Sequence, residues 1–182
     1  MGIHAFDISP EICDFYQSMP DGNAGTLYGL EDRWNMIAAA HQVAHRTELT
    51  IPDVSHYILT YSPVGSPSQP ARPSATWPGK GKLSLQRPDR GSARLVYQTG
   101  RYWHFFFKQS LISEIATEAG WDEHVQPREL HDLHDGQFAQ EAEKFALRAA
   151  DPADPPSCIE MDSRAYLVGL ELLGATRRRR GD

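Results

Sequence analysis

The sequence lacks the features that are typical of membrane, disulfide-rich and nucleic-acid-binding proteins. No apolar run in its 182 residues approaches the roughly 20 residues that a membrane-spanning helix requires. It has only two cysteines, Cys13 and Cys158, which are far apart and in no metal-binding spacing. The formal net charge is -6, whereas a broad nucleic-acid surface is basic. The first residues carry acids and no continuous apolar stretch, unlike a signal peptide. We therefore expect a cytoplasmic protein with reduced thiols and no membrane partner.

Signatures of several enzyme classes are also missing. No serine stands in the G-x-S-x-G pattern of a nucleophile elbow. The GKGK stretch at 79–82 lacks the spacing and the Ser or Thr of a phosphate-binding loop. Cys158 has no histidine partner that the sequence identifies, and a lone cysteine is more often structural. We therefore predict that the chain is not an enzyme and binds no cofactor.

Two pairs of histidines come closest to a metal motif. His41 and His45 would share one face of a helix, as zinc-binding histidines do. The zinc-protease pattern needs a glutamate after the first histidine as general base, and Gln42 stands there instead. His131 and His134 are more simply explained as part of a polar helix start. The sequence thus predicts no metal site.

Residues 51–108 are rich in strand formers, proline and glycine. Alternation over Val54–Tyr61 predicts a strand with one side made of Tyr57, Leu59 and Tyr61 and the other of His56, Ile58 and Thr60. Further strands are expected at 82–86, 93–97 and 102–107, the last aromatic and buried on both faces. The proline-rich stretch 63–78 is expected to form an exposed loop.

The aromatic strands provide a candidate ligand site. Large rings with a few polar tips suit a small-molecule pocket at the mouth of a barrel. We expect this pocket to be lined by Tyr57, Tyr61, Trp103 and His104. The alternative is that these rings simply fill the core.

Residues 109–182 predict helices. Ser110 is the expected cap of the first, and Gly120 its left-handed end. A second runs from about Asp135 to Ala150. A third is expected to start near Asp162 or Ser163 and to finish in four arginines, 177–180. Its apolar positions Tyr166, Leu170 and Leu173 would pair with a second copy of the chain or pack on its own barrel. Strands followed by helices predict the α+β class.

The order of these features resembles a known family. GKLSLQRPDRG at 81–91 resembles the glycine, strand, proline, glycine signature of cupin barrels, with two extra residues. YWHFFFKQSLISEIATEAG at 102–120 is similar to the passage from the last barrel strands into the first helix in sensor domains of AraC-type regulators. HDLHDGQFAQEAEKFALRA at 131–149 and MDSRAYLVGLELLGATRRRRG at 161–181 look like the two helices that close such sensors. The resemblance covers about residues 50–182.

This resemblance implies a fold and a function. The fold is a small cupin-like (double-stranded β-helix) barrel with an N-terminal extension at 1–108, followed by a helical dimerisation segment at 109–182. The function is that of a metal-free ligand-sensing and dimerisation domain of an AraC-type transcriptional regulator, which binds a small-molecule effector. Homodimers are expected, and DNA would be contacted only through a helix-turn-helix domain that this sequence does not show.

Two other functions stay open at this stage. The first is a metal-dependent cupin enzyme, such as a dioxygenase or isomerase, with ligands drawn from His41, His45, His56 and His104. Catalytic cupins, however, supply an H-x-H pair, whereas here His56 stands alone and Ser92 follows Gly91. The second is a dimerisation module without a ligand.

Overall fold

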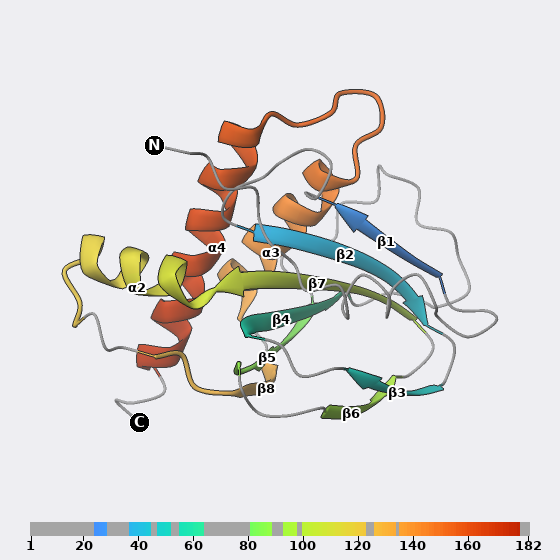
Figure 1. Cartoon of the computed structure of the whole chain (residues 1–182), viewed down its shortest axis with the longest axis horizontal. Helices are drawn as coiled ribbons and strands as arrows, with labels where there is room; N and C mark the ends of the chain where they lie inside the picture. Colours follow the sequence, from blue (N-terminus) through green and yellow to red (C-terminus); the bar gives the residue numbers. More distant parts are fainter. Residues whose placement is uncertain are drawn as a thin grey trace.

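The computed structural model describes residues 24–28, 37–44, 47–51, 55–63, 81–88, 93–97, 100–122, 126–133 and 135–178. The strands and helices of these ranges appear in Figure 1. In chain order they are β1 (Ala24–Tyr28), β2 (Ile37–Ala44), β3 (Thr47–Ile51), β4 (His56–Pro63), β5 (Gly81–Gln86), β6 (Ala93–Tyr97), β7 (Gly100–Lys108), α2 (Gln109–Glu118), β8 (Leu130–Leu133), α3 (Gly136–Ala149) and α4 (Cys158–Arg178).

The main sheet has six antiparallel strands in the order β1-β2-β7-β4-β5-β8. Strands β3 and β6 form a second, two-stranded sheet. One register runs through both sheets, from Ile37 opposite Phe107 to Ile51 opposite Ala93. The pair β3–β6 therefore continues the ladder of β2 and β7 beyond the main sheet.

This architecture confirms the α+β class. In the described part of the chain, β1 and β8 end the six-stranded sheet and do not pair with each other, so that sheet is open. The segment expected to be helical also contributes an edge strand, β8, whose Leu130 and Leu133 lie opposite Leu85 and Leu83. Its four residues are too short to show a period in the sequence.

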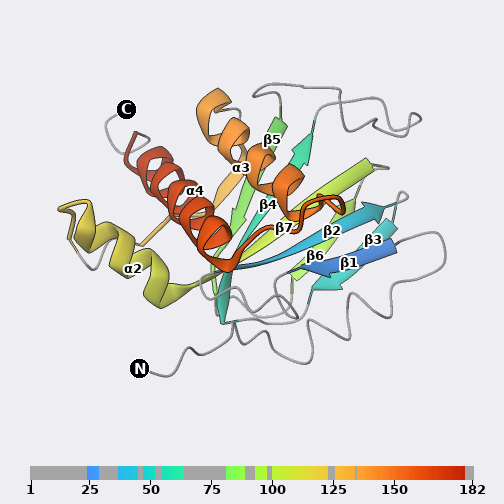
Figure 2. The ribbon, with the colours of Figure 1, turned by 90° about the horizontal axis from the view of Figure 1, so that it is seen from above.

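Helices α3 and α4 pack against one face of the main sheet, and α2, which directly follows β7, lies beside α4, as Figure 2 shows from above. The side chains that meet them come from alternate strand positions, because successive residues of a strand point to opposite faces. They belong to one buried core and include Tyr57, Leu59, Tyr61, Leu83, Leu85, Trp103, Phe105 and Phe107. Phe105 meets Phe145 of α3 edge-on, with ring centroids 5.2 Å apart. We call this side of the sheet the helix face.

The helix boundaries confirm some expectations and correct others. Asp135 caps α3 as predicted, because its carboxylate accepts a hydrogen bond from the amide of Phe138 at 3.1 Å. Gly120 has a φ of 71°, as expected for a left-handed helix end. The expectation for Ser110 was wrong: α2 begins at Gln109, after Lys108, with no side-chain cap.

The third helix begins four to five residues earlier than predicted, at Cys158. Its start follows a capping-box pattern, Ser157-x-x-Glu160, in which the Ser157 hydroxyl accepts from the amide of Glu160 at 3.2 Å. Arg148 of α3 then donates to the Glu160 carboxylate at 2.7 Å and joins the two helices. Farther along α4, a Cβ on Gly169 would lie 2.5 Å from Ile115 Cδ1, so glycine permits the close approach of α2.

Candidate functional site

The face of the sheet opposite the helices is chemically distinct, and we call it the second face. The strands β2, β7, β4 and β5 lie side by side there. Their registers align a middle row of four residues: Ala40, His104, Thr60 and Ser84. The row therefore joins an imidazole and two hydroxyls from three neighbouring strands.

His104 and Thr60 are directly bonded across this row. Thr60 Oγ1 lies 3.1 Å from His104 Nδ1. The imidazole is completely buried, with 0% of its surface exposed. A hydroxyl can donate to or accept from a ring nitrogen, so the bond is compatible with a neutral imidazole in either tautomer.

Apolar and polar rows flank the middle row on either side. Phe106 and Ile58 are register partners, and each is 1% exposed. Toward the other end lie Tyr102 on β7 and the register partners Ser62 and Lys82. The second face thus changes from hydrocarbon to hydrogen-bonding groups along the strands.

Buried polarity is the unusual property of this face. Among the described strand residues, the two buried polar side chains, His56 and His104, both occupy second-face positions. An antiparallel sheet commonly leaves its polar face in water, because burying polar groups costs free energy. Buried polar groups are normally hydrogen-bonded within the protein, as the His104–Thr60 pair is, and they distinguish this face from the helix face.

The structure does not bring the four predicted pocket residues together. Tyr57, Tyr61 and Trp103 lie on the helix face, inside the core with the helices. His104 lies on the second face, because it directly follows Trp103 in the strand. Tyr28 stacks on Trp103 with ring centroids 5.5 Å apart. This placement agrees with the alternative that the three helix-face rings fill the core.

Tyr61 brings one unusual polar group into that core. Its hydroxyl is buried and has no hydrogen-bond partner. Burial raises the pKa of Tyr61 above its ordinary value of 10.0, and the charge of Glu143 raises it further. The hydroxyl is therefore held protonated in an apolar environment.

Sequence reasoning did not select Thr60, Ser84, Phe106 or Tyr102. The signal was present, because the alternation over Val54–Tyr61 already separated His56, Ile58 and Thr60 from the aromatic side. The predicted pocket residues were chosen because their rings are large. The residues of the second face become apparent only when the register between neighbouring strands is known.

Two of the histidines that were considered as metal ligands, His41 and His131, lie in strands and not in helices. His41 lies in strand β2, opposite Trp103, so a helical spacing with residue 45 does not apply. His131 lies in β8 and not at a helix start, with Nε2 3.9 Å from the Glu129 carboxylate. His45 and His134 lie outside the described residues. Within the described ranges, no three His, Cys, Asp or Glu side chains are grouped to hold a metal ion.

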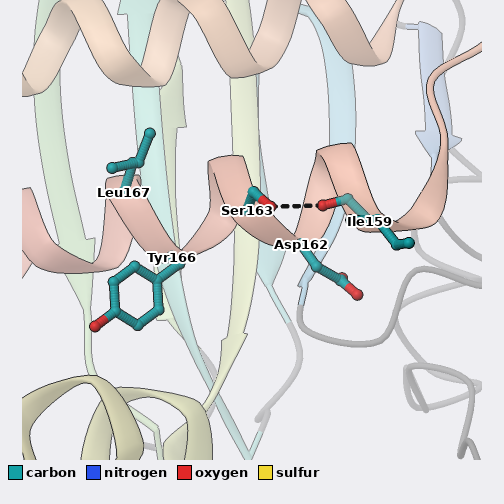
Figure 3. Close-up of a pocket in the computed structure, with 5 residues that line it drawn as sticks. All are labelled: Ile159, Asp162, Ser163, Tyr166 and Leu167. Atoms are coloured by element: carbon teal, nitrogen blue, oxygen red, sulfur yellow. Dashed lines mark hydrogen bonds between the residues drawn. The ribbon is translucent and has the colours of Figure 1, made fainter. Parts of the chain in front are cut away.

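A shallow pocket on the outer side of α4 is the second candidate site (Figure 3). It is lined by Ile159, Asp162, Ser163, Tyr166 and Leu167. Ile159 is 80% exposed and Leu167 47%, so apolar surface meets solvent here. We call these five residues the α4 groove.

The three predicted dimer contacts fall at different depths. Tyr166 is partly buried and points toward α2 in Figure 3. A hydrogen bond to Glu118 and partial burial raise the pKa of the Tyr166 hydroxyl. Leu170 is also partly buried, whereas Leu173 is 0% exposed and packs in the chain's own core. The outer surface of α4 therefore centres on the groove, and Leu173 lies inside.

Comparisons of the chain with protein-family models, curated proteins and solved structures return no match. None of the helices in the described ranges combines the length and the apolar character needed to cross a bilayer.

Proposed function

We propose that the chain is a ligand-sensing and dimerising domain of the AraC type, which binds a small molecule on its second face and pairs with a second copy through α4. The proposal combines the resemblance of residues 50–182 with the chemistry of the sheet. The single observation that carries it is the bond between buried His104 and partly buried Thr60, with Ser84 next to them in the same row. Binding, and not catalysis, is the proposed role of this row.

The proposed container is a cupin-like barrel, of which the open sheet forms one wall. The β3–β6 extension supports this idea, because its pairs have the same register as the pairs of β2 and β7. Long, bent strands that contribute to two sheets are a common way to enclose an interior. The regulatory output would pass to a helix-turn-helix unit supplied elsewhere.

The second face is connected to α4 through α2. Strand β7, which carries His104 and Phe106, continues into α2 without an intervening residue. Helix α2 contacts α4 closely where Ile115 meets Gly169. A ligand that binds better to one position of β7 would therefore shift the population of α2–α4 arrangements. The α4 groove would report this shift to the second copy.

Thermal unfolding in the presence of fractionated metabolite pools tests the proposal. A ligand at about 100 times its Kd stabilises a fold by about 2.7 kcal/mol, or roughly 5–10 °C in a chain of this size. We expect such a shift for the wild type and for Tyr61→Phe on the helix face. Thr60→Val keeps the side-chain shape and removes the hydroxyl, so it should weaken binding about tenfold.

Two results would count against the proposal. One is the absence of any stabilising fraction. The other is a shift that survives Thr60→Val unchanged and disappears in Tyr61→Phe, since this would locate the ligand on the helix face.

A further inference from the structure

A stripe of uncharged residues runs along the outer side of α4 and extends the α4 groove toward the end of the helix. We call it the α4 stripe, and it consists of Ile159, Ser163, Tyr166, Leu167, Leu170 and Gly174. Residues three, four, seven or eight positions apart share one side of a helix, so these residues lie on one line. Ile159, Ser163 and Leu167 are exposed, and the others are partly buried. The stripe thus offers apolar surface to a partner.

The residues of the α4 stripe have complementary sizes about the point between Tyr166 and Leu167. Ile159 and Gly174 lie equally far from this point on opposite sides, and one is large whereas the other has no side chain. Ser163 and Leu170 are also equally far from it, and again one is small and one is large. Two α4 helices that run in opposite directions would therefore place each large residue against a small residue of the other copy.

A parallel pair in register would bring each residue of the stripe against its own counterpart. The small residues Ser163 and Gly174 would then face each other across the pair, and so would the large residues Ile159 and Leu170. Facing residues pack densely when large and small side chains interdigitate, and small residues that face each other leave voids. The sizes of the side chains therefore favour the antiparallel arrangement.

The charged residues beside the stripe favour the same arrangement. Glu160, Arg164 and Glu171 lie on the side of α4 that faces α3: Glu160 accepts from Arg148 and from Arg164, and Glu171 accepts from Gln137. In the antiparallel pair, Arg164 of one copy and Glu171 of the other differ in height by only about 3 Å along the helix axis. Each such pair occurs twice, because a twofold axis relates the copies. In a parallel pair, residues of the same charge would lie at equal heights.

We propose that two copies of the chain pair through antiparallel α4 helices, with the twofold axis between Tyr166 and Leu167. Ile159 of each copy contacts Gly174 of the other, and Ser163 contacts Leu170. This inference rests on the proposed function and specifies how the second copy is seated on α4.

Disulfide cross-linking of the full chain tests the direction and the register of the pair. Both native cysteines are first replaced, as Cys13→Ser and Cys158→Ser. New cysteines are then introduced in four separate variants: Leu167→Cys, Ile159→Cys, Ser163→Cys/Leu170→Cys and, as a control on α3, Leu147→Cys. Leu147 is a suitable control because it is 54% exposed and lies outside the stripe. Mild oxidation and non-reducing electrophoresis measure the covalent dimer, and light scattering measures the dimer before oxidation.

We expect efficient cross-linking in Leu167→Cys and in Ser163→Cys/Leu170→Cys. A disulfide requires Cα atoms within about 7 Å of each other. The two copies of residue 167 lie at the twofold axis, whereas those of residue 159 would be about 22 Å apart along the helices. Ile159→Cys should therefore cross-link no more than Leu147→Cys.

The outcomes separate this inference from the proposed function. Cross-linking of Ile159→Cys as efficient as that of Leu167→Cys would show a parallel pair, which would overturn the inference and leave dimerisation through α4 in place. A dimer in which no stripe variant cross-links more than Leu147→Cys would overturn both the inference and the role of α4. A monomeric chain before oxidation would contradict dimerisation itself.

Discussion

The ring of Tyr61 lies directly over the backbone of Gly81. A Cβ atom built on Gly81 would be 2.1 Å from Tyr61 Cε2 and 2.9 Å from Cζ. The two residues are diagonal neighbours on β4 and β5, since Gly81 pairs with Pro63 and Tyr61 pairs with Leu83. Glycine is needed here because the aromatic ring occupies the space of a side chain, and the ring in turn covers the bare backbone.

Gly81→Ala should therefore destabilise the fold. Because the clash involves a rigid ring in a packed core, we expect a loss of about 1–3 kcal/mol in the free energy of unfolding. Urea unfolding measures it. Gly100→Ala is the matched control, because its Cβ would make only an ordinary contact, 3.6 Å from Tyr102 Cε2. Equal losses in the two variants would show that the Tyr61 ring does not require glycine.

Tyr61→Phe should stabilise the fold by about 1 kcal/mol at neutral pH. An unpaired buried hydroxyl costs roughly 1–3 kcal/mol, and phenylalanine removes it without changing the ring. Tyr102→Phe, on the second face, serves as a control in the same urea experiment. A loss of stability in Tyr61→Phe would mean that the hydroxyl makes a favourable contact.

The raised pKa of Tyr61 also predicts that the stability of the fold depends on pH in the alkaline range. The folded-state pKa of Tyr61 lies above 10.0, the ordinary value that applies to the unfolded chain. The unfolded state therefore loses its proton first, and stability falls as the pH rises through 10.0. Below that pH the Tyr61 hydroxyl is protonated in both states, so its ionisation no longer changes the stability. Urea unfolding at increasing alkaline pH should show a smaller decline in Tyr61→Phe than in the wild type, and parallel curves would contradict the assignment.

Glu160→Gln should lower the melting temperature near neutral pH. The hydrogen bond from Arg148 holds the pKa of the Glu160 carboxyl below its ordinary value of 4.5, with further help from Arg164. A group whose pKa is lowered in the folded state stabilises the fold at pH values above its unfolded-state pKa. This stabilisation is lost as the pH falls through its folded-state pKa. The difference between wild type and variant should thus shrink below about pH 4.5. Glu114→Gln, an exposed position on α2, is the control for the loss of a carboxylate and should leave the melting temperature near neutral pH unchanged.

The α4 groove should mediate dimerisation. Leu167→Glu places a charge in its apolar surface and should convert a dimer into a monomer in size-exclusion chromatography with light scattering. Leu147→Glu is the matched control, since Leu147 is 54% exposed on α3. A monomeric wild type, or an equal loss of the dimer in both variants, would contradict the prediction that the α4 groove mediates dimerisation.

Much of the fold could be predicted where local pattern and tertiary packing agree. The strand at 93–97 was predicted exactly, and the alternation in β4 separated its two faces correctly. The strand β2 was not predicted, because its alanine-rich sequence IAAAHQVA has helix-forming residues. It is a strand because β1 and β7 pair with it on both sides, and such tertiary pairing outweighs propensity.

The candidate site was less accessible to sequence reasoning. Trp103 and His104 are neighbours in sequence and were grouped together, but a strand directs them to opposite faces. The relation between His104 and Thr60 depends on a register between residues 44 positions apart. The start of α4, in contrast, carried a capping box at Ser157 and Glu160 that local analysis could have recognised.

A crystal structure of the chain with the compound that stabilises it most, from the metabolite pools described above, tests the central claim most directly. The account predicts ligand density on the second face, within hydrogen-bond distance of Thr60 Oγ1 or His104 and in contact with Phe106. Density among Tyr57, Tyr61 and Trp103 on the helix face, with the His104–Thr60 row untouched, would contradict it.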